Sequence, residues 1–350
     1  MLALVLTTAA AGFAPTDSVA AYERYKADFG KSYPAHEEEH RFANFRASLS
    51  AIRVGNAERA ARGVDETQGL NQHSDLSPEE FRAQLLCTLK HRRPSQPPPP
   101  LLPKNACAAC ERFPEVESVV TSSNYTSFDW TTKGAVTPVK DQAGCGGCWA
   151  FSVAADVEGT HFLATGNLTS LSEEQMIGCD PETRGQGCDG GEPSLALDYV
   201  VQNGLTSEQS YPFSDGSGPE HTHCASEKIR APLAHISKWV QVSSYPNTNE
   251  EGLAAALAKN GPLSLSIDAS AMHHYAGGVD DPVTHGPDAT CQDVHVNHAV
   301  LLVGYGVDQG KEYWRIKNSW GTAFGEAGYY RVARGSNICG LANDVVHSVV

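Results

Sequence analysis

The sequence RRPSQPPPP, from Arg92 to Pro100, constrains the fold of this chain more than any other feature. Each proline lacks a backbone donor, and its ring clashes with the preceding helical turn, so no helix continues through the run. Proline-rich segments instead adopt extended conformations and act as spacers. The run therefore predicts a linker between an N-terminal segment and a larger C-terminal unit.

The N-terminal segment, residues 16–90, is rich in charged residues with helical spacing. One set of side chains recurs at steps that keep it on a single helical face. We expect a helix whose stripe consists of Glu37, Arg41, Phe45, Ile52 and Asn56.

The stretch NACAACERFPEVESVVTSSNYTSFDW follows the linker and shows little periodicity. Exposed segments without regular structure are preferred sites of proteolysis. We expect a cut between Phe113 and Ser127.

From Asp129 to Val350 the sequence becomes aromatic-rich and punctuated by glycine. Trp149–Leu163 predicts a helix that starts at or just before Cys148 and stops at Thr165-Gly166-Asn167. One face of this helix is expected to hold Ala150, Val153, Ala154, Val157 and His161. Four strand-like runs follow, PLSLSIDA, HAVLLVGYG, EYWRIKNSW and GYYRVAR. A helical first half and a β-rich second half predict two lobes with a cleft between them.

Composition excludes several classes of partner. The net charge of −15 argues against nucleic acid and anionic membrane surfaces, which reward clustered Lys and Arg. No apolar run reaches the roughly 18 residues that a membrane helix needs. We therefore expect no membrane and no nucleic-acid partner.

Several features favour the secretory pathway. The start MLALVLTTAAAGFA has a short apolar run followed by small residues, as in a signal peptide, although it lacks a basic n-region; a buried terminal strand is the alternative. Ten cysteines suit an oxidising compartment. Asn124-Tyr125-Thr126 and Asn167-Leu168-Thr169 match the glycosylation pattern.

The motif Cys145-Gly-Gly-Cys148 allows three interpretations. A redox pair needs a strand leading into the motif, but GAVTPVKDQAG contains Pro138 and ends in loop residues. A zinc site would add Cys107 and Cys110, but the gap between the pairs is too long for a zinc ribbon and contains the expected cut. We expect no metal and no cofactor.

The third interpretation makes Cys148 a nucleophile. A cysteine at a helix N-terminus is favoured as a thiolate by the free N–H groups and the helix dipole. His298, just ahead of a strand-like run, supplies a base, and Asn318 in KNSWG can orient an imidazole by a hydrogen bond. Trp320 could cover that bond from water.

These motifs resemble the papain family of cysteine proteases, most closely its cathepsin L group. The pattern CGGCW with His about 150 residues downstream is typical of the family, and GAVTPVKDQAGCGGCWAFS, GCDGG, VNHAVLLVGYG and KNSWGTAFGEAGYYRVARG extend the resemblance over 129–350. Gly147 departs from a usual Ser, and Phe324 from a usual Trp. The resemblance implies an α+β, papain-like fold with a helical lobe, a β-barrel-like lobe and an active-site cleft between them, preceded by a helical propeptide.

The resemblance also implies the catalytic roles. Cys148 would attack the peptide carbonyl to give an acyl-enzyme that water hydrolyses, and His298 would act as acid and base. Asn318 would orient His298. Gln142 would offer its side-chain amide to the oxyanion beside the Cys148 backbone N–H, and losing one such donor typically costs about 3 kcal/mol.

By the same resemblance Cys148 stays reduced, and three disulfides pair Cys145 with Cys188, Cys179 with Cys224, and Cys291 with Cys339. Spacing alone would leave these pairings open. Cys87, Cys107 and Cys110 remain without an assigned partner: Cys107 and Cys110 could close a loop or hold a cleaved segment, or one could pair with Cys87.

Substrate binding is assigned by resemblance to a set of residues that comprises Gly190, Gly191, Glu192, Pro193, Ser266, Val296, Ala299, Trp320 and Asp344. Two carboxylates are unusual in a pocket that takes the second residue before the cut. We expect tolerance of arginine there beside hydrophobic residues, unless both carboxylates point to solvent.

The N-terminal segment resembles the propeptide of cathepsin L-like zymogens, with Ser48 where Asn is expected and His73 where Phe is expected in GLNQHSD. It would block the cleft. A His73 that charges near pH 6 would weaken docking on acidification, whereas an exposed His73 would do nothing.

We predict a signal peptide at 1–14, an inhibitory propeptide at 15–90, a linker with its CxxC insert at 91–123 and a peptidase domain at 124–350. The expected protein is a monomeric cysteine endopeptidase made as a zymogen, with protein or peptide substrates and its own propeptide as inhibitor. It would be secreted, or reside in a lysosome or acidic vacuole. A binding homologue without catalysis is the competing class.

Overall fold

The computed structural model describes residues 15–87, 127–180, 187–214, 223–229, 231–285, 289–293 and 295–350. The predicted signal peptide, the linker, Cys107, Cys110 and nearly all of the segment expected to be cut lie outside these residues.

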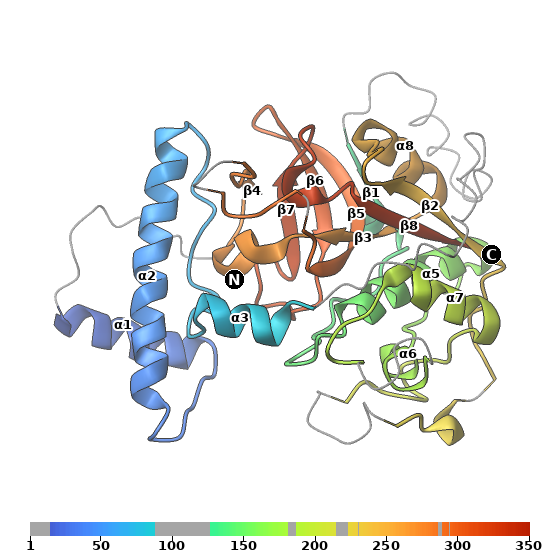
Figure 1. Ribbon diagram of the computed structural model, residues 1–350, viewed down its shortest axis with the longest axis horizontal. Helices are drawn as coiled ribbons and strands as arrows, with labels where there is room; N and C mark the ends of the chain where they lie inside the picture. Colours follow the sequence, from blue (N-terminus) through green and yellow to red (C-terminus); the bar gives the residue numbers. More distant parts are fainter. Residues whose placement is uncertain are drawn as a thin grey trace.

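The N-terminal segment, which by the resemblance is called the propeptide, contributes three helices, α1 (Pro15–Asp28), α2 (Glu38–Ala61) and α3 (Pro78–Leu85). Helix α2 covers the predicted stripe except Glu37, which is its N-cap. Helix α3 starts with a capping box, in which Ser77 accepts from the Glu80 N–H and Glu80 accepts from the Ser77 N–H. Figure 1 shows α1 and α2 crossing on one side of the molecule, while α3 leads toward the helical lobe.

The helical lobe contains α5 (Cys148–Thr165), α6 (Glu173–Cys179) and α7 (Pro193–Asn203). As predicted, α5 starts at Cys148 and ends at Gly166, which adopts the left-handed conformation as C-cap. Of the residues predicted to share one face, Ala150, Val153, Ala154 and Val157 are buried and His161 is half-buried; every other residue from Cys148 to Thr160 is buried as well. Neighbours on several sides, α6, α7 and the sheet, explain this burial.

The second lobe is a mostly antiparallel sheet in the order β2-β8-β3-β5-β6-β7-β4, and β1 also pairs with β5. Its strands are β1 (Phe128–Asp129), β2 (Lys238–Ser244), β3 (Leu263–Ile267), β4 (Val279–Asp280), β5 (His298–Asp308), β6 (Lys311–Lys317), β7 (Tyr329–Ala333) and β8 (Asp344–Val349). The four predicted strands are confirmed as β3, β5, β6 and β7. Helix α8 (Glu250–Asn260) also belongs to this lobe.

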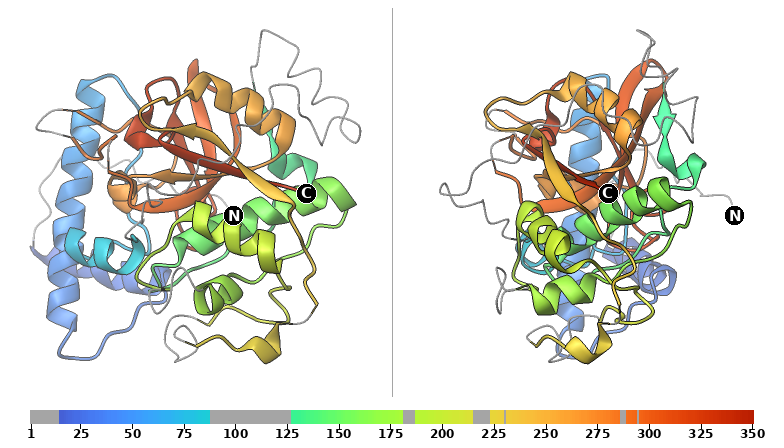
Figure 2. Two further views of the ribbon diagram at one scale, coloured as in Figure 1. Left: turned by 45° about the vertical axis from the view of Figure 1, so that its right-hand side comes forward. Right: turned by 90° about the vertical axis from the view of Figure 1, so that its right-hand side faces the viewer.

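Helix α5 lies against the sheet, with the helical lobe on one side and the strands on the other (Figures 1 and 2). Ser152 of α5 donates to the Val300 carbonyl of β5 at 2.7 Å and bonds Ser264 of β3 at the same distance. The expected two-lobed α+β fold is therefore present. Because Cys148 and His298 are the first residues of α5 and β5, the packing of these two elements sets their relative position.

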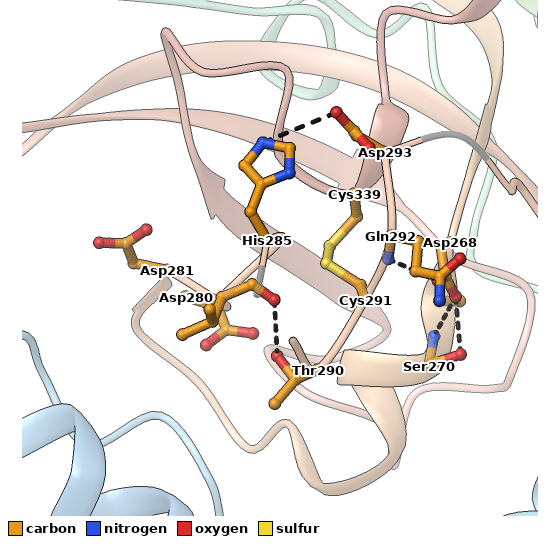
Figure 3. The surroundings of a disulfide bond; sticks show 12 residues. Asp268, Ser270, Asp280, Asp281, His285, Thr290, Cys291, Gln292, Asp293 and Cys339 are labelled. Carbon is orange, nitrogen blue, oxygen red and sulfur yellow. Dashed lines mark hydrogen bonds and ion pairs between the residues drawn. A yellow bond between two sulfur atoms is a disulfide. The ribbon is translucent and has the colours of Figure 1, made fainter. Parts of the chain in front are cut away.

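Three disulfides stabilise the described chain from residue 127 onward, and they join Cys145 to Cys188, Cys179 to Cys224 and Cys291 to Cys339. These are the pairs that the resemblance implied. Figure 3 shows the Cys291–Cys339 bond beside Asp268, whose carboxylate accepts from the Gln292 N–H at 2.7 Å. The Cys291–Cys339 disulfide holds the segment that leads into β5.

Candidate active site

As the sequence predicted, Cys148 lies at the N-terminus of α5, where it is fully buried. Its sulfur is not free, however: it forms a disulfide with Cys87 of the propeptide. The expectation of a reduced Cys148 is therefore wrong for this chain with its N-terminal segment attached, and Cys87 has a partner. The reason lies in tertiary packing, which brings the end of α3 onto the start of α5.

The two glycines before Cys148 make the close packing possible. A Cβ added to Gly146 would lie 2.3 Å from the Cys188 carbonyl oxygen, which accepts from the Gly146 N–H. A Cβ added to Gly147 would lie 2.8 Å from Ile177 and 3.1 Å from the Cys145 sulfur. The departure from Ser at Gly147 thus fits the crowding by Ile177.

His298 lies at the start of β5, fully buried. One ring nitrogen, Nε2, lies 2.8 Å from Asn318 Oδ1, so this nitrogen carries the proton and donates. The other, Nδ1, is buried and has no hydrogen-bond partner among the described residues. Trp320 stacks on the ring at 4.7 Å between centroids and shields it from water.

The protonation of His298 follows from its surroundings. Burial lowers the pKa of His298 from 6.5 to about 4, and the bond with Asn318 opposes this only in part. With Cys148 in a disulfide, no thiolate is present to stabilise an imidazolium. The imidazole is therefore neutral in this form.

Gln142 is fully buried instead of facing water. Its Nε2 donates to the Cys145 carbonyl at 2.9 Å and to the Leu85 carbonyl of the propeptide at 3.2 Å, while Ser319 donates to its Oε1 at 2.6 Å. Lys140 anchors the same loop, since its ammonium bonds Glu173 at 2.6 Å and Glu158 at 3.2 Å. Gln142 thus already binds a carbonyl oxygen beside Cys148.

The propeptide also donates hydrogen bonds to backbone carbonyls on both sides of this site. The Cys87 N–H donates to the Asn297 carbonyl, next to His298, at 2.8 Å. Gln72 donates to the Trp320 carbonyl at 2.7 Å. The propeptide therefore occupies the groove around the candidate catalytic residues.

His73 is half-buried in this interface and its Nε2 atom is fully enclosed, so the alternative of an exposed His73 is excluded. Its ring meets Phe81 edge-on at 5.9 Å and Trp320 at 5.6 Å. His273 stacks on Phe81 at 4.3 Å and on His274 at 4.1 Å. Burial lowers the pKa values of all three histidines, those of His73 and His274 to about 3.

The two candidate specificity carboxylates lie together. Glu192 is buried, and its pKa is raised to about 9 by burial and by the nearby charge of Asp344, to which it also hydrogen-bonds. Asp344 accepts from Gln241 Nε2 and from Ser266 Oγ, each at 3.0 Å. The alternative in which both carboxylates point to solvent is excluded, because Glu192 is buried, and its raised pKa keeps it protonated at pH 7.

The remaining candidate binding residues line the same region. Gly191 packs against the Trp149 ring, where an added Cβ would lie 2.5 Å away, and Gly190 adopts a positive φ. Val296 and Ala299 belong to the hydrophobic cluster that includes Cys148, and Pro193 is the first residue of α7.

Sequence reasoning missed Ser319, Gln241 and Asn297 as contributors to the site. Ser319 directly follows Asn318, and Asn297 directly precedes His298. Adjacency to a predicted catalytic residue was the signal that could have identified both. Gln241 had none, because it reaches Asp344 only through the pairing of β2 with β8. Within the described ranges, no group of three or more His, Cys, Asp or Glu side chains could hold a metal.

Family models match two parts of the chain. Residues 125–349 match the model described as papain family cysteine protease, and residues 22–81 match the cathepsin propeptide inhibitor domain.

Relatives and solved structures agree with these matches. Cysteine proteinase 15A of Pisum sativum is 37% identical and covers 91% of this chain and 83% of its own length. Digestive cysteine proteinase 2 of Homarus americanus is 34% identical, with 94% of both chains covered. The structure of digestive procathepsin L2 proteinase from the Tenebrio molitor larval midgut superposes with a TM-score of 0.77 at 31% identity, covering 95% of this chain and all of the other.

Proposed function

We propose that this chain, which belongs to the papain family of cysteine proteases and is a zymogen with its own inhibitory propeptide, cleaves peptide bonds through Cys148 and His298. The observation that carries the proposal is that Gln142 donates to the Leu85 carbonyl, two residues before the Cys87 that is bonded to Cys148, while Asn318 holds His298 at the start of β5.

In the proposed reaction the Cys148 thiolate attacks the substrate carbonyl carbon. Gln142 Nε2 and the Cys148 backbone N–H then hold the oxyanion. His298, oriented by Asn318, protonates the leaving amine, and water attacks the acyl-enzyme with His298 as base.

The charge state of His298 would change on activation. A thiolate beside the ring favours the imidazolium, which offsets the burial that lowers the His298 pKa in the zymogen. The active form would then contain a thiolate and imidazolium pair.

We propose a basic or hydrophobic residue at the second position before the cut. The pocket combines apolar Val296 and Ala299 with the Glu192–Asp344 pair. A protonated Glu192 leaves one negative charge, on Asp344, which could bind an arginine. A neutral apolar side chain would also be accepted, because the charge of Asp344 is already bonded by Gln241 and Ser266.

Zymogens of this family are typically secretory, lysosomal or vacuolar, and we propose such a compartment here. The disulfides of the peptidase part suit it, and Asn167 of the second glycosylation pattern is exposed. None of the helices in the described part of the chain is long and apolar enough to cross a membrane. We further propose a monomer that binds no nucleic acid, in line with the acidic net charge.

An epoxide that alkylates active-site thiols tests the mechanism. After activation at acid pH with a reductant, the wild type should be labelled at Cys148 and should cleave a fluorogenic peptide, and Cys148→Ala should do neither. A wild type that is reduced and processed yet neither labelled nor active would favour the alternative of a binding homologue.

A further inference from the structure

The disulfide between Cys87 and Cys148 joins two residues that are 61 positions apart and belong to different parts of the zymogen. Cys87 follows the last helix of the propeptide, and Cys148 begins the first helix of the peptidase. Both side chains are buried.

The position of Cys87 does not depend on the sulfur–sulfur bond. Its N–H donates to the Asn297 carbonyl, and the Leu85 carbonyl two residues earlier accepts from Gln142. Leu85 and Leu86 are buried in the main hydrophobic cluster of the peptidase. These contacts would hold the Cys87 thiol against Cys148 even in the reduced protein.

We propose that Cys87 is a redox switch of the zymogen, which covalently blocks the Cys148 nucleophile until a thiol reductant releases it. The inference rests on the proposed role of Cys148. It adds covalent inhibition to the steric inhibition by the propeptide. A propeptide that undocks would still be tethered to the catalytic sulfur.

The chemistry balances with low-molecular-weight thiols and disulfides. In an oxidising lumen the two cysteine thiols reduce one disulfide, RSSR, and release two RSH while the Cys87–Cys148 bond forms. On activation, a thiolate RS⁻ attacks the Cys87 sulfur, and the bond breaks with its electron pair going to Cys148. A second RS⁻ attacks the mixed disulfide, so that RSSR leaves and Cys87 takes up a proton as its thiol.

Cys148 is the better leaving group of the two. Its thiolate lies at the N-terminus of α5, where N–H groups and the helix dipole favour negative charge. Attack on Cys87 therefore releases the nucleophile directly in its reactive form.

Burial imposes an order on activation. Cys87 is 5% exposed and Cys148 is inaccessible, so a reductant reaches the bond only after the propeptide loosens. Cleavage between the propeptide and the peptidase would not by itself free the site, because Cys87 lies N-terminal to the expected cut. Processed but unreduced protein should contain two chains joined by this disulfide.

Peptide mapping of the full-length zymogen under non-reducing conditions tests the bond itself. A linked pair of peptides containing Cys87 and Cys148 is expected. Free Cys148, or Cys148 linked to Cys107 or Cys110 instead, would overturn the proposal.

Epoxide labelling at acid pH, with and without tris(2-carboxyethyl)phosphine, tests the switch. In the wild type, Cys148 should be labelled only when the phosphine is present. In Cys87→Ser, Cys148 should be labelled without it. Labelling of Cys87→Ser in the presence of the phosphine shows whether reduction of the other disulfides damages the site. Equal labelling of unreduced wild type and Cys87→Ser would overturn the switch. If the reduced wild type is labelled at Cys148 but cleaves no peptide, the proposed function is wrong while the redox switch is supported. If Cys87→Ser does not fold, the peptide map of the wild type decides whether the disulfide exists.

Discussion

Arg59 of propeptide helix α2 donates two hydrogen bonds to the Asp280 carboxylate of the peptidase, at 2.7 Å from Nη2 and 3.2 Å from Nε. Both side chains are buried, at 4% and 1% exposed. Thr67 and Tyr330 donate to the same carboxylate at 2.7 and 2.9 Å. This pair anchors the propeptide at a distance from the cleft.

Replacing Arg59 should release the propeptide. Arg59→Ala leaves the Asp280 charge buried without its cation, and breaking one partner of a buried pair costs about 3–5 kcal/mol. We expect faster activation at mildly acidic pH and a lower denaturation midpoint of the zymogen. Arg62→Ala is the matched control, because Arg62 bonds the exposed Asp281 carbonyl and its loss should change little. Identical activation rates for the two variants would contradict the anchoring role.

His73 should make propeptide docking sensitive to acid. Burial first, then Lys31 and His273, lower the His73 pKa from 6.5 to about 3, and Asp75 opposes this. Because the docked pKa is depressed, docking is strongest above pH 6.5. As pH falls from 6.5 toward 3, the undocked state gains a proton and docking loses about 1.4 kcal/mol per pH unit.

His73→Phe should therefore shift the midpoint of acid activation to lower pH, because Phe keeps the ring contacts with Phe81 and Trp320 and cannot be protonated. Activation is measured by labelling of Cys148 in the presence of reductant across pH 3–7. The control is His36→Phe, because His36 is 80% exposed and should leave the profile unchanged. An unchanged midpoint in His73→Phe would rule out His73 as an acid sensor.

Asp344 and Glu192 should differ in their effect on specificity. Asp344→Asn removes the charge of the pair and should lower cleavage after Arg-Arg relative to Phe-Arg. Glu192→Gln should change that ratio little at pH 7 and below, since Glu192 is already neutral there. The ratio of kcat/KM for the two fluorogenic substrates measures this, and no cleavage of Arg-Arg by the wild type would refute the basic pocket.

Gln142→Ala should lower kcat with little change in KM. Its amide acts on the oxyanion, and loss of one such donor costs a factor on the order of 10² to 10³. Gln202→Ala is a control with the same substitution, because Gln202 is exposed at the end of α7 and should leave kcat for Phe-Arg near the wild-type value. Steady-state kinetics of the reduced, processed enzyme decide the outcome.

The sequence by itself determined the local structure around the site. The start of α5 at Cys148, its stop at Gly166 and the four strands β3, β5, β6 and β7 followed from patterns within short windows, since helix and strand periods are local properties. Strands β2 and β8 were missed, and the structure defines them through their pairing with each other and the pairing of β8 with β3, which lie far apart in the sequence.

Tertiary structure alone decided which distant groups meet. Cys87 reaches Cys148, Glu192 meets Asp344, and α5 is buried on all sides only because two lobes and a propeptide pack together. The ionisation of Glu192, His73 and His298 likewise depends on burial, which no window of sequence contains.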